Sequence, residues 1–421
     1  MNILVVGSGG REHTLVWKIL KSPRVDKVYC APGNGGISKI AESVDIDVTD
    51  LNKLTHFAQK QSIDLTVVGP ELPLTLGIVD AFKEKGLEVF GPSKLAAELE
   101  GSKAFSKDLM KKYHIPTAEY QVFTEPDSAF RYLQSIEPPV VLKADGLAAG
   151  KGVLVCNSRN EMFDGAEKIM TERAFGEAGD RLIVEECLVG EEVSVLAITD
   201  GEDMLLLPPS QDHKPIFEGD KGPNTGGMGA YSPAPVMTDK LLETVKEKIL
   251  IPTIQGMKSE GRLYQGVLYA GLMITSEGPK VLEYNCRFGD PEIQSILPLL
   301  ESDIIDLIEA ALDGKIKTAP FKLMKKSAVC VVMASGGYPN SYKKGMVIHG
   351  LDRDDDNVVI FHAGTKAKGK DIVTSGGRVL GVTSINDTIE SAIKSVYQAV
   401  GSITFDGAYY RRDIGQKALN R

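Results

Sequence analysis

The stretch from Val281 to Glu292 combines residue types that could bind a metal ion and a phosphate. Within it, Glu283, Asn285 and Arg287 follow one another at two-residue spacing. In a strand they would share one face, because side chains alternate. The other face would carry four apolar residues: Leu282, Tyr284, Cys286 and Phe288. Carboxylate and amide oxygens suit a divalent cation, and a guanidinium suits an anion. The pattern favours a phosphate bound through magnesium, with a solvated edge strand as the alternative.

Length and composition indicate a cytoplasmic protein built from several domains. The chain has 421 residues, 43% of them hydrophobic, which allows about three domains with sizeable cores. We see no basic leader and no apolar run near the roughly 18 residues of a membrane span. The net charge of -9 argues against nonspecific nucleic-acid binding. Buried free thiols are expected at the five widely spaced cysteines, without disulfides or zinc: Cys30, Cys156, Cys187, Cys286 and Cys330.

The N-terminal residues carry the pattern of a small parallel α/β sheet. Apolar strands followed by helical patterns are expected at 3–13, 27–32, 64–71 and 87–92. The first glycine turn resembles a dinucleotide fingerprint, but Glu12 replaces its last glycine and no acid ends the next strand. These differences disfavour NAD. The helix N-termini after Gly10 and Gly35 could hold a substrate phosphate, and tight packing would explain the glycines equally well.

Residues 140–156 are two apolar strands joined by a loop of glycine, alanine and lysine. The loop is not a Walker motif, because the spacing fails and a strand follows it instead of a helix. Such a hairpin can fold its backbone N–H groups over a triphosphate, with Lys143 and Lys151 neutralising charge. We expect it to be mobile and to close over a nucleotide; a plain flexible hairpin is the alternative. Upstream, Ser102 caps a helix that begins at Lys103.

Two further stretches are candidate ligand contacts. Residues 182–195 are a strand, an acidic turn and a second strand. Backbone groups there could meet an adenine and Glu191 could meet ribose hydroxyls, although acidic turns are usually solvated. Residues 208–235 form a long loop without periodicity, which inside a compact domain is commonly functional or disordered. His213 in this loop is a candidate base, with a hydrogen-bonding scaffold as the alternative.

The C-terminal part is expected to be a scaffold that closes one wall of the site. The strand at 265–275 should pair with the one that carries Glu283. From about Lys325 a third unit follows, with a helix after its strands, and we see no catalytic constellation in it. Its strands are expected at 328–333, 358–363 and 379–383.

Four motifs stand in one order along the chain, at 101–103, 142–152, 222–231 and 282–292. Together they resemble the ATP-grasp ligases and, within them, the glycinamide ribonucleotide synthetase family of purine biosynthesis. The resemblance covers essentially the whole chain, and the last two motifs are specific to that family. It implies an α/β and α+β protein with an ATP-grasp fold. The implied domains are an N-terminal parallel α/β domain at 1–102, an ATP-grasp domain at 103–324 with a mobile lid at about 124–190, and a C-terminal α+β domain at 325–421.

The same resemblance implies a reaction and the residues that serve it. ATP, glycine and 5-phosphoribosylamine would give glycinamide ribonucleotide, ADP and phosphate through a glycyl phosphate. Glu283 and Asn285 would hold Mg²⁺ (or Mn²⁺), and Lys103, Lys143 and Arg287 would be catalytic. The implied ATP-binding residues are Lys103, Lys143, Gly146, Gly150, Lys151, Gly152, Glu185, Glu186 and Glu191. The substrate residues would be Asp212, Lys214, Asn224, Thr225, Gly226, Gly227 and Arg287, joined by Gly9 and Gly10. A monomer without nucleic-acid or membrane partners is expected.

Three departures from the family pattern affect these expectations. Pro215 stands where members usually carry Arg, and Ile293 stands where they carry Thr, so acceptor contacts there are in question. The strand from Val267 to Ile274 lacks the metal-binding carboxylate that many ATP-grasp enzymes have. Three other functions remain open: a carboxylase-like relative that activates bicarbonate, a nicotinamide oxidoreductase, and a nucleotide-sensing module without turnover.

Overall fold

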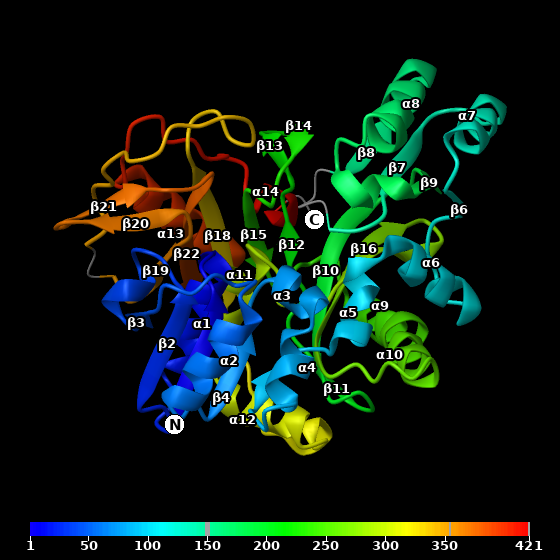
Figure 1. Ribbon diagram of the computed structural model, residues 1–421. Helices are drawn as coiled ribbons and strands as arrows, with labels where there is room; N and C mark the ends of the chain where they lie inside the picture. Colours follow the sequence, from blue (N-terminus) through cyan, green and yellow to red (C-terminus); the bar gives the residue numbers. More distant parts are fainter. Residues whose placement is uncertain (148–151, 353–354, 420–421) are drawn as a thin grey trace.

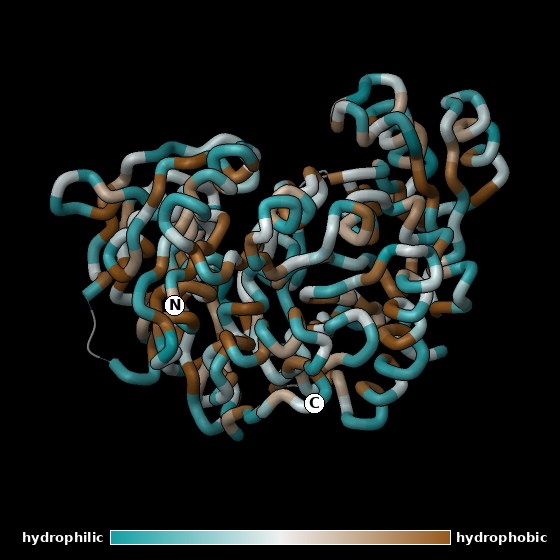
Figure 2. The backbone as a smooth tube through the Cα atoms, turned by 60° about the horizontal axis from the view of Figure 1, so that its bottom comes forward, coloured by the Kyte–Doolittle hydropathy of each residue, from teal (hydrophilic) through white to brown (hydrophobic). Residues whose placement is uncertain are grey.

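The computed structural model describes residues 1–147, 152–352 and 355–419. Figure 1 shows the N-terminal unit at the lower left, the C-terminal strands at the upper left and a separate lobe at the upper right, around a central sheet. Hydrophobic segments run through the interior of these parts, whereas loops and outer helix faces are mostly hydrophilic (Figure 2). The mixed α/β and α+β architecture predicted from the sequence is confirmed.

The N-terminal unit is a parallel sheet in the order β3-β2-β1-β4-β5. Its strands are β1 Asn2–Gly7, β2 Lys27–Pro32, β3 Glu42–Ser43, β4 Leu65–Val68 and β5 Val89–Phe90. Its helices are α1 Gly10–Ile19, α2 Leu51–Lys60, α3 Glu71–Leu76, α4 Ile78–Lys83 and α5 Lys94–Gly101. β4 is buried at every position, and all of its residues except Thr66 are apolar, as is typical of a strand covered on both faces. The turn that follows β1 and the helix α3 that follows β4 bring Glu12 and Glu71 to the carboxyl edge of the sheet, where α/β proteins place ligands.

The upper-right lobe is an antiparallel sheet in the order β6-β9-β7-β8. It contains β6 Tyr120–Phe123, α7 Pro126–Ser135, β7 Val140–Ala144, β8 Val153–Cys156, α8 Arg159–Ala166, and β9 Leu182–Glu186. A short π-helical segment, Glu167–Thr171, and a 3₁₀ turn, Gly176–Asp180, follow α8. The lobe packs its own apolar core, which includes Leu142, Met162 and Leu182. It therefore packs as a unit that holds the glycine-rich hairpin.

The central sheet is antiparallel, in the order β11-β10-β16-β17. Its strands are β10 Glu191–Thr199, β11 Met204–Leu206, β16 Gly266–Thr275 and β17 Gly278–Asn285. The helices around it are α6 Lys103–Lys112, α9 Asp239–Val245, the π-helical Lys246–Leu250, α10 Ile251–Ser259, α11 Glu292–Ile296 and α12 Ile304–Leu312. Two sequence predictions are confirmed here: β16 pairs with β17, and the Ser102 side chain caps α6 by accepting a hydrogen bond from the Phe105 N–H.

The C-terminal sheet has the order β12-β15-β18-β22-β19. Three strands come from the expected places: β18 Ser327–Ala334, β19 Val358–His362 and β22 Arg378–Asn386. Outside this sheet lie β20 Thr365–Lys368, β21 Asp371–Thr374, α13 Ile389–Gly401 and α14 Gln416–Leu419. Within residues 1–147, 152–352 and 355–419, no helix is long and apolar enough to cross a membrane.

Two expectations about local structure are wrong. Residues 208–235 are not an unstructured loop: they form β12 Gln211–Asp212, β13 Pro215–Phe217, β14 Lys221–Asn224 and β15 Gly229–Ser232. β15 pairs with β18 of the C-terminal sheet, so these short segments gain strand structure from a partner about a hundred residues away in sequence. Cys187 is partly exposed, whereas the other cysteines are buried as expected; all five are free thiols.

Candidate active site

The polar face predicted for β17 is present in the structure, but the strand does not alternate regularly. Gly271 of β16 pairs with Glu283 and Leu272 pairs with Val281, so Leu282 is an extra, bulged residue. The bulge moves Val281 into the core beside Tyr284 and leaves Leu282 only partly buried, which corrects the predicted apolar face. Glu283, Asn285 and Arg287 still share a polar face. The bulged carbonyl of Leu282 accepts a hydrogen bond from Lys143 Nζ at 3.0 Å.

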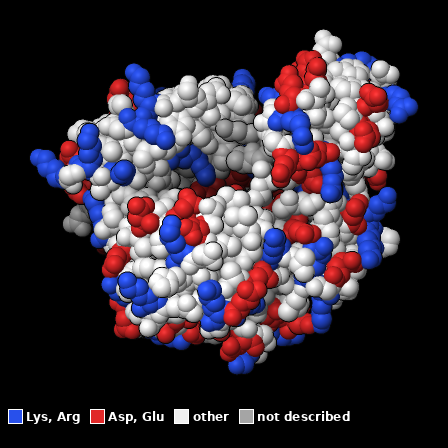
Figure 3. All heavy atoms as spheres, in the orientation of Figure 1, with Lys and Arg blue, Asp and Glu red and all other residues white. Residues whose placement is uncertain are grey.

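Lysines from three separate elements surround Glu283. Lys214 Nζ lies 3.8 Å from its carboxylate, and the charges of Lys143 and Lys103 also act on it. Burial would raise the pKa of Glu283, but these positive charges outweigh burial and hold the pKa below its usual value. Glu283 is therefore an anion in a strongly positive environment. Figure 3 shows a hollow between the two upper lobes, with acidic and basic side chains in it.

Lys143 on β7 is held by a buried carboxylate. Its Nζ lies 2.9 Å from Glu185 Oε1, and Lys107 Nζ of α6 lies 3.0 Å from Glu185 Oε2. All three side chains are nearly inaccessible to solvent. Because one carboxylate is flanked by two ammonium groups, the cluster keeps an excess positive charge. Glu185, predicted to contact ATP, is thus placed behind Lys143 as its partner.

Lys103 lies at the first position of α6, and its Nζ donates to the Gly146 carbonyl at 2.7 Å. Asp145 accepts hydrogen bonds from the Ser102 hydroxyl and from the Ala104 N–H at 3.1 Å. The start of α6 is therefore tied to the end of β7. Lys103 and Lys143 are brought together beside the glycine hairpin, as the sequence reasoning expected.

Three more of the residues predicted for ATP are described by the structure: Gly152, Glu186 and Glu191. The Gly152 carbonyl accepts a hydrogen bond from the Ala144 N–H at 2.9 Å, which closes the base of the hairpin. Glu186 and Glu191 are exposed at the two ends of the connection between β9 and β10. Gly150 and Lys151 lie outside the described residues.

Arg287 bridges the central sheet to the N-terminal unit. Its Nε donates to Glu71 at 3.0 Å, and its Nη2 donates to Glu100 at 3.2 Å and to Asn285 Oδ1 at 3.0 Å. Burial acts to lower the pKa of Arg287, but the charges of Glu100 and Glu71 outweigh burial and hold the pKa above its usual value. Arg287 remains a fixed cation whose position depends on α3 and α5.

The residues predicted for the amine substrate lie at the other end of the polar face. Lys214 Nζ pairs with Glu192 at 2.9 Å, and surrounding carboxylates raise its pKa despite burial. Asp212 on β12 is buried, and burial raises its pKa to about 7 although the charge of Lys214 opposes this. Asn224 ends β14, and the Thr225 N–H and hydroxyl both donate to the Lys214 carbonyl. Lys214 lies beside Glu283, and Thr225 is tied to the Lys214 backbone.

Gly226 and Gly227 are held by an arginine of the C-terminal unit. Arg378 donates to the Gly226 carbonyl and, at 2.8 Å, to the Asp290 carbonyl. Gly227 has a φ of +105°, and a Cβ there would lie 2.4 Å from the ring of Pro291. The glycine is required by both backbone conformation and space.

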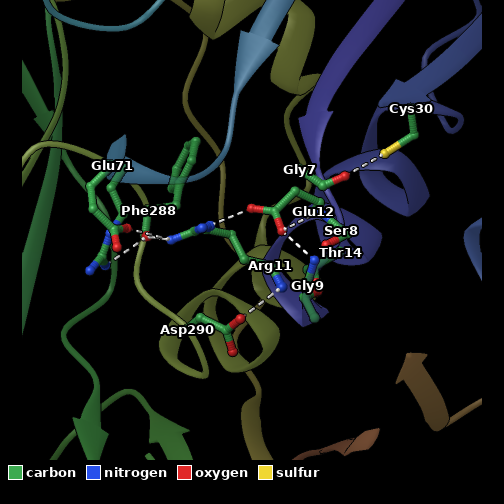
Figure 4. A network of polar contacts seen from close by, with 12 residues as sticks. Gly7, Ser8, Gly9, Arg11, Glu12, Thr14, Cys30, Glu71, Phe288 and Asp290 are labelled. Atoms are coloured by element: carbon green, nitrogen blue, oxygen red, sulfur yellow. Dashed lines mark hydrogen bonds and ion pairs between the residues drawn. The ribbon is translucent and has the colours of Figure 1, made fainter. Parts of the chain in front are cut away.

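Carboxylates already occupy the N-terminus of α1, where Gly9 and Gly10 were predicted to meet a phosphate. The Ser8 and Gly9 N–H groups donate to Glu12, and the Arg11 N–H donates to Asp290 at 3.3 Å (Figure 4). A phosphate at this terminus would compete with both carboxylates. The Glu12 side chain also fills the turn where a dinucleotide would approach, which counts against NAD.

His213 is not placed as an obvious base. Its ring is almost fully buried, and burial lowers its pKa to about 4. It lies in the segment between β12 and β13, stacked at an angle against Tyr231. The ring nitrogens have no hydrogen-bond partner among the described residues. Its neighbours Asp212 and Lys214 interact with Glu283 instead.

Comparison with known proteins agrees with this geometry. Three phosphoribosylglycinamide synthetase domain models match the chain: the N domain at residues 1–100, the ATP-grasp (A) domain at 101–293 and the C domain at 328–417. The phosphoribosylamine–glycine ligase of Rhodopirellula baltica is 51% identical, over 99% of this chain and 98% of its own length. The chain belongs to the phosphoribosylglycinamide synthetase family.

Solved structures support the same family and its fold. The phosphoribosylamine–glycine ligase of Thermotoga maritima has a TM-score of 0.83 and 34% identity, covering 98% of this chain and all of its own. The biotin carboxylase domain of the Hydrogenobacter thermophilus 2-oxoglutarate carboxylase has a TM-score of 0.74 at 17% identity, covering 97% and 91% of the two chains. At that identity the likeness concerns the fold alone. The chain is thus an ATP-grasp ligase.

The donor set on β17 fits the divalent metal that ATP-grasp ligases use. Glu283 and Asn285 supply two hard oxygen ligands, and Mg²⁺ commonly binds through one or two protein oxygens plus substrate phosphates. Asn285 Oδ1 accepts a hydrogen bond from Arg287, but an amide oxygen has a second lone pair for a metal. Among the described residues no cluster of three or more His, Cys, Asp or Glu could hold a metal ion.

The departures from this synthetase family have structural explanations. Ile293 is fully buried in an apolar core, which explains why an apolar residue is tolerated there. Pro215 begins β13, and its carbonyl accepts a hydrogen bond from Arg411. On β16, which lacks a carboxylate, the Tyr269 hydroxyl donates to Glu292 at 2.9 Å.

Sequence reasoning missed several residues that organise the site. Glu71 and Glu100 position Arg287, Lys107 shares Glu185, Glu192 pairs with Lys214, and Arg378 ties the C-terminal unit to the glycine loop. Glu192 lay within the acidic turn that was singled out, and Glu100 directly precedes the 101–103 motif. For the others, no local pattern in the sequence identifies a partner so distant along the chain.

Proposed function

We propose that the chain joins glycine to 5-phosphoribosylamine at the expense of ATP, giving glycinamide ribonucleotide, ADP and phosphate in purine biosynthesis. The observation that carries the assignment is the meeting of Lys103, Lys143 and Lys214 around Glu283, on a family-specific strand. Three cations from separate segments of the chain match substrates that carry phosphate charge, and both ATP and phosphoribosylamine do.

On the nucleotide side, the lysines and the glycine hairpin hold the phosphates. Lys103 and Lys143 neutralise charge at the β- and γ-phosphates, and the hairpin from Gly146 to Gly152 closes over them and excludes water. Glu283 and Asn285 would hold Mg²⁺ or Mn²⁺, which would neutralise phosphate charge. The connection between Glu186 and Glu191 contacts adenine and ribose in this proposal.

In the first step a glycine carboxylate oxygen attacks the γ-phosphorus, and ADP leaves with the electron pair of the broken P–O bond. The product is glycyl phosphate, whose phosphate is a far better leaving group than an oxide ion. Arg287, held by two carboxylates, stabilises the negative charge that develops.

In the second step the amine nitrogen of phosphoribosylamine attacks the glycyl carbonyl carbon. The C–N bond forms, the C–O bond to phosphate breaks, and the nitrogen loses a proton to the surroundings. Asp212, Lys214 and residues Asn224 to Gly227 bind this acceptor, with the turn at Gly9 and Gly10 at its edge. All of these groups come from one chain, which supports action as a monomer, and the free thiols agree with a cytoplasmic setting.

Phosphate release tests the assignment against its alternatives. The purified protein with Mg²⁺ and ATP should release phosphate at its full rate only when glycine and phosphoribosylamine are both present. ATP binding without release under those conditions would instead indicate a nucleotide-sensing module. Release that depends on bicarbonate would indicate a carboxylase-like enzyme.

A further inference from the structure

The largest fully buried side chain in the described part of the protein belongs to an arginine near the C-terminus, Arg411. Its guanidinium makes a two-bond fork with Asp413, with Nε to Oδ1 at 2.8 Å and Nη2 to Oδ2 at 2.7 Å. It also donates to the Pro215 carbonyl at 2.9 Å and to Asp220 Oδ1 at 3.0 Å. Hydrogen bonds to charged acceptors stabilise a buried arginine, and here two carboxylates and a carbonyl accept four of them.

The partners of Arg411 lie at both ends of the β13–β14 hairpin. Pro215 is its first residue, and Asp220 lies in its turn with a left-handed φ of +55°. Neighbouring residues reinforce the contact: the Gly219 N–H donates to Asp413 Oδ2 at 2.8 Å, and Lys417 Nζ lies 2.6 Å from Asp220 Oδ2. The C-terminal segment thus clamps the hairpin at its base and at its tip. In Figure 1 the hairpin stands at the top centre, close to α14.

The clamped hairpin is continuous with the residues assigned to the amine substrate. Pro215 directly follows Lys214, whose Nζ reaches Glu192 and Glu283. Pro215 also pairs with Asn224 across the hairpin, and the Thr225 N–H donates to the Lys214 carbonyl at 2.9 Å. A displacement of the hairpin base therefore moves both Lys214 and the loop that begins at Asn224. The phosphate lysines Lys103 and Lys143 come from α6 and β7, which the clamp does not touch.

We propose that Arg411 is a positioning residue for the amine acceptor: by clamping the β13–β14 hairpin it fixes Lys214 and the loop from Asn224 to Gly227. This inference rests on the proposed function, because it assigns that loop to phosphoribosylamine. Small misplacements of binding groups carry large kinetic costs, so loss of the clamp acts on acceptor binding before it acts on ATP. A lysine cannot replace the arginine, since a single ammonium cannot reproduce the planar fork to Asp413 together with two further partners.

The test compares KM values for the three substrates in the intact protein. Arg411→Met is the direct variant, and Asp220→Asn is a milder one that leaves the Arg411–Asp413 fork in place. Arg24→Met is the matched control, because Arg24 also contacts two carboxylates, but on the exposed face of α12. Phosphate release is measured with each substrate varied in turn at saturating levels of the others, and the folded fraction is measured by thermal unfolding.

We expect the KM for phosphoribosylamine to rise roughly tenfold or more in Arg411→Met and less in Asp220→Asn, with the KM for ATP within about twofold of the wild type. Arg411→Lys should not restore it, and Arg24→Met should leave all three values unchanged. If Arg411→Met and Asp220→Asn both lose folded protein while their KM values stay unchanged, Arg411 has a purely structural role and the inference is overturned. Failure of the proposed function is separate: the wild type would then show no amine-dependent phosphate release.

Discussion

Replacing Glu71 with Gln removes one charge from the pair that holds Arg287, with little change in shape. Burial alone would raise the pKa of Glu71, but the charges of Arg287 and Arg11 outweigh it and lower the pKa from 4.5 to about 2. Because one pKa unit corresponds to about 1.4 kcal/mol, the ionised carboxylate contributes about 3 kcal/mol to the free energy of unfolding at neutral pH. Glu71→Gln should lose most of that amount.

The loss of stability caused by Glu71→Gln should depend on pH. A carboxylate whose folded pKa is depressed contributes fully above its unfolded value of 4.5, and the contribution is lost as pH falls through about 2. The difference between wild type and Glu71→Gln should therefore be about 3 kcal/mol at pH 7 and shrink to about 1 kcal/mol at pH 3. Urea unfolding at pH 7, 5, 4 and 3 measures it.

The exposed pair between Lys27 and Glu42 supplies the control. Its atoms are 2.7 Å apart, but the Glu42 side chain is 54% exposed, so Glu42→Gln should cost less than about 1 kcal/mol at any pH. A difference for Glu71→Gln that is as small as the control, or that does not change with pH, would refute the view that Arg287 is anchored by an ionised Glu71.

Two further substitutions test the supports of the site. Lys107→Met should destabilise the protein by about 3 kcal/mol and raise the KM for ATP, because the buried carboxylate of Glu185 is then left to Lys143 alone. The control is Lys112→Met, at an exposed position of the same helix, which should cost under about 1 kcal/mol in urea unfolding. Equal effects would contradict the buried cluster. Gly227→Ala should cost about 2 kcal/mol or more, through a left-handed backbone and a clash with Pro291. Gly86 has a φ of +67° with open space around it, so the control Gly86→Ala should cost only about 1 kcal/mol. A larger loss of stability at Gly86 than at Gly227 would exclude the steric argument.

Much of the fold could be predicted because local patterns and tertiary structure agree. The apolar strands of the first sheet, the capped helix after Ser102 and the pairing of β16 with β17 all follow from periodicity and turn residues. The segment from 208 to 235 could not be predicted in the same way. Its short strands have no period of their own and form because β15 pairs with β18.

The features of the site that the sequence did not predict also depend on contacts between residues far apart in the chain. Glu283 and Asn285 could be proposed as metal ligands from the sequence because they stand in a short family-specific motif with suitable oxygen chemistry. The bulge at Leu282 could not be foreseen, since the sequence there alternates without a break and only the pairing with β16 shows the extra residue. The partners of Arg287 lie about two hundred residues upstream, and ion pairs at that separation leave no local signal.

The central claim is that glycine is activated by phosphorylation before the amine attacks. Glycine labelled with ¹⁸O in both carboxylate oxygens should therefore transfer one ¹⁸O atom to each phosphate released, because the C–O bond of glycyl phosphate breaks in the second step. Mass spectrometry of the phosphate after turnover with ATP, Mg²⁺ and phosphoribosylamine gives the answer. Singly labelled phosphate in a one-to-one ratio with glycinamide ribonucleotide is the predicted result, and unlabelled phosphate would contradict the account.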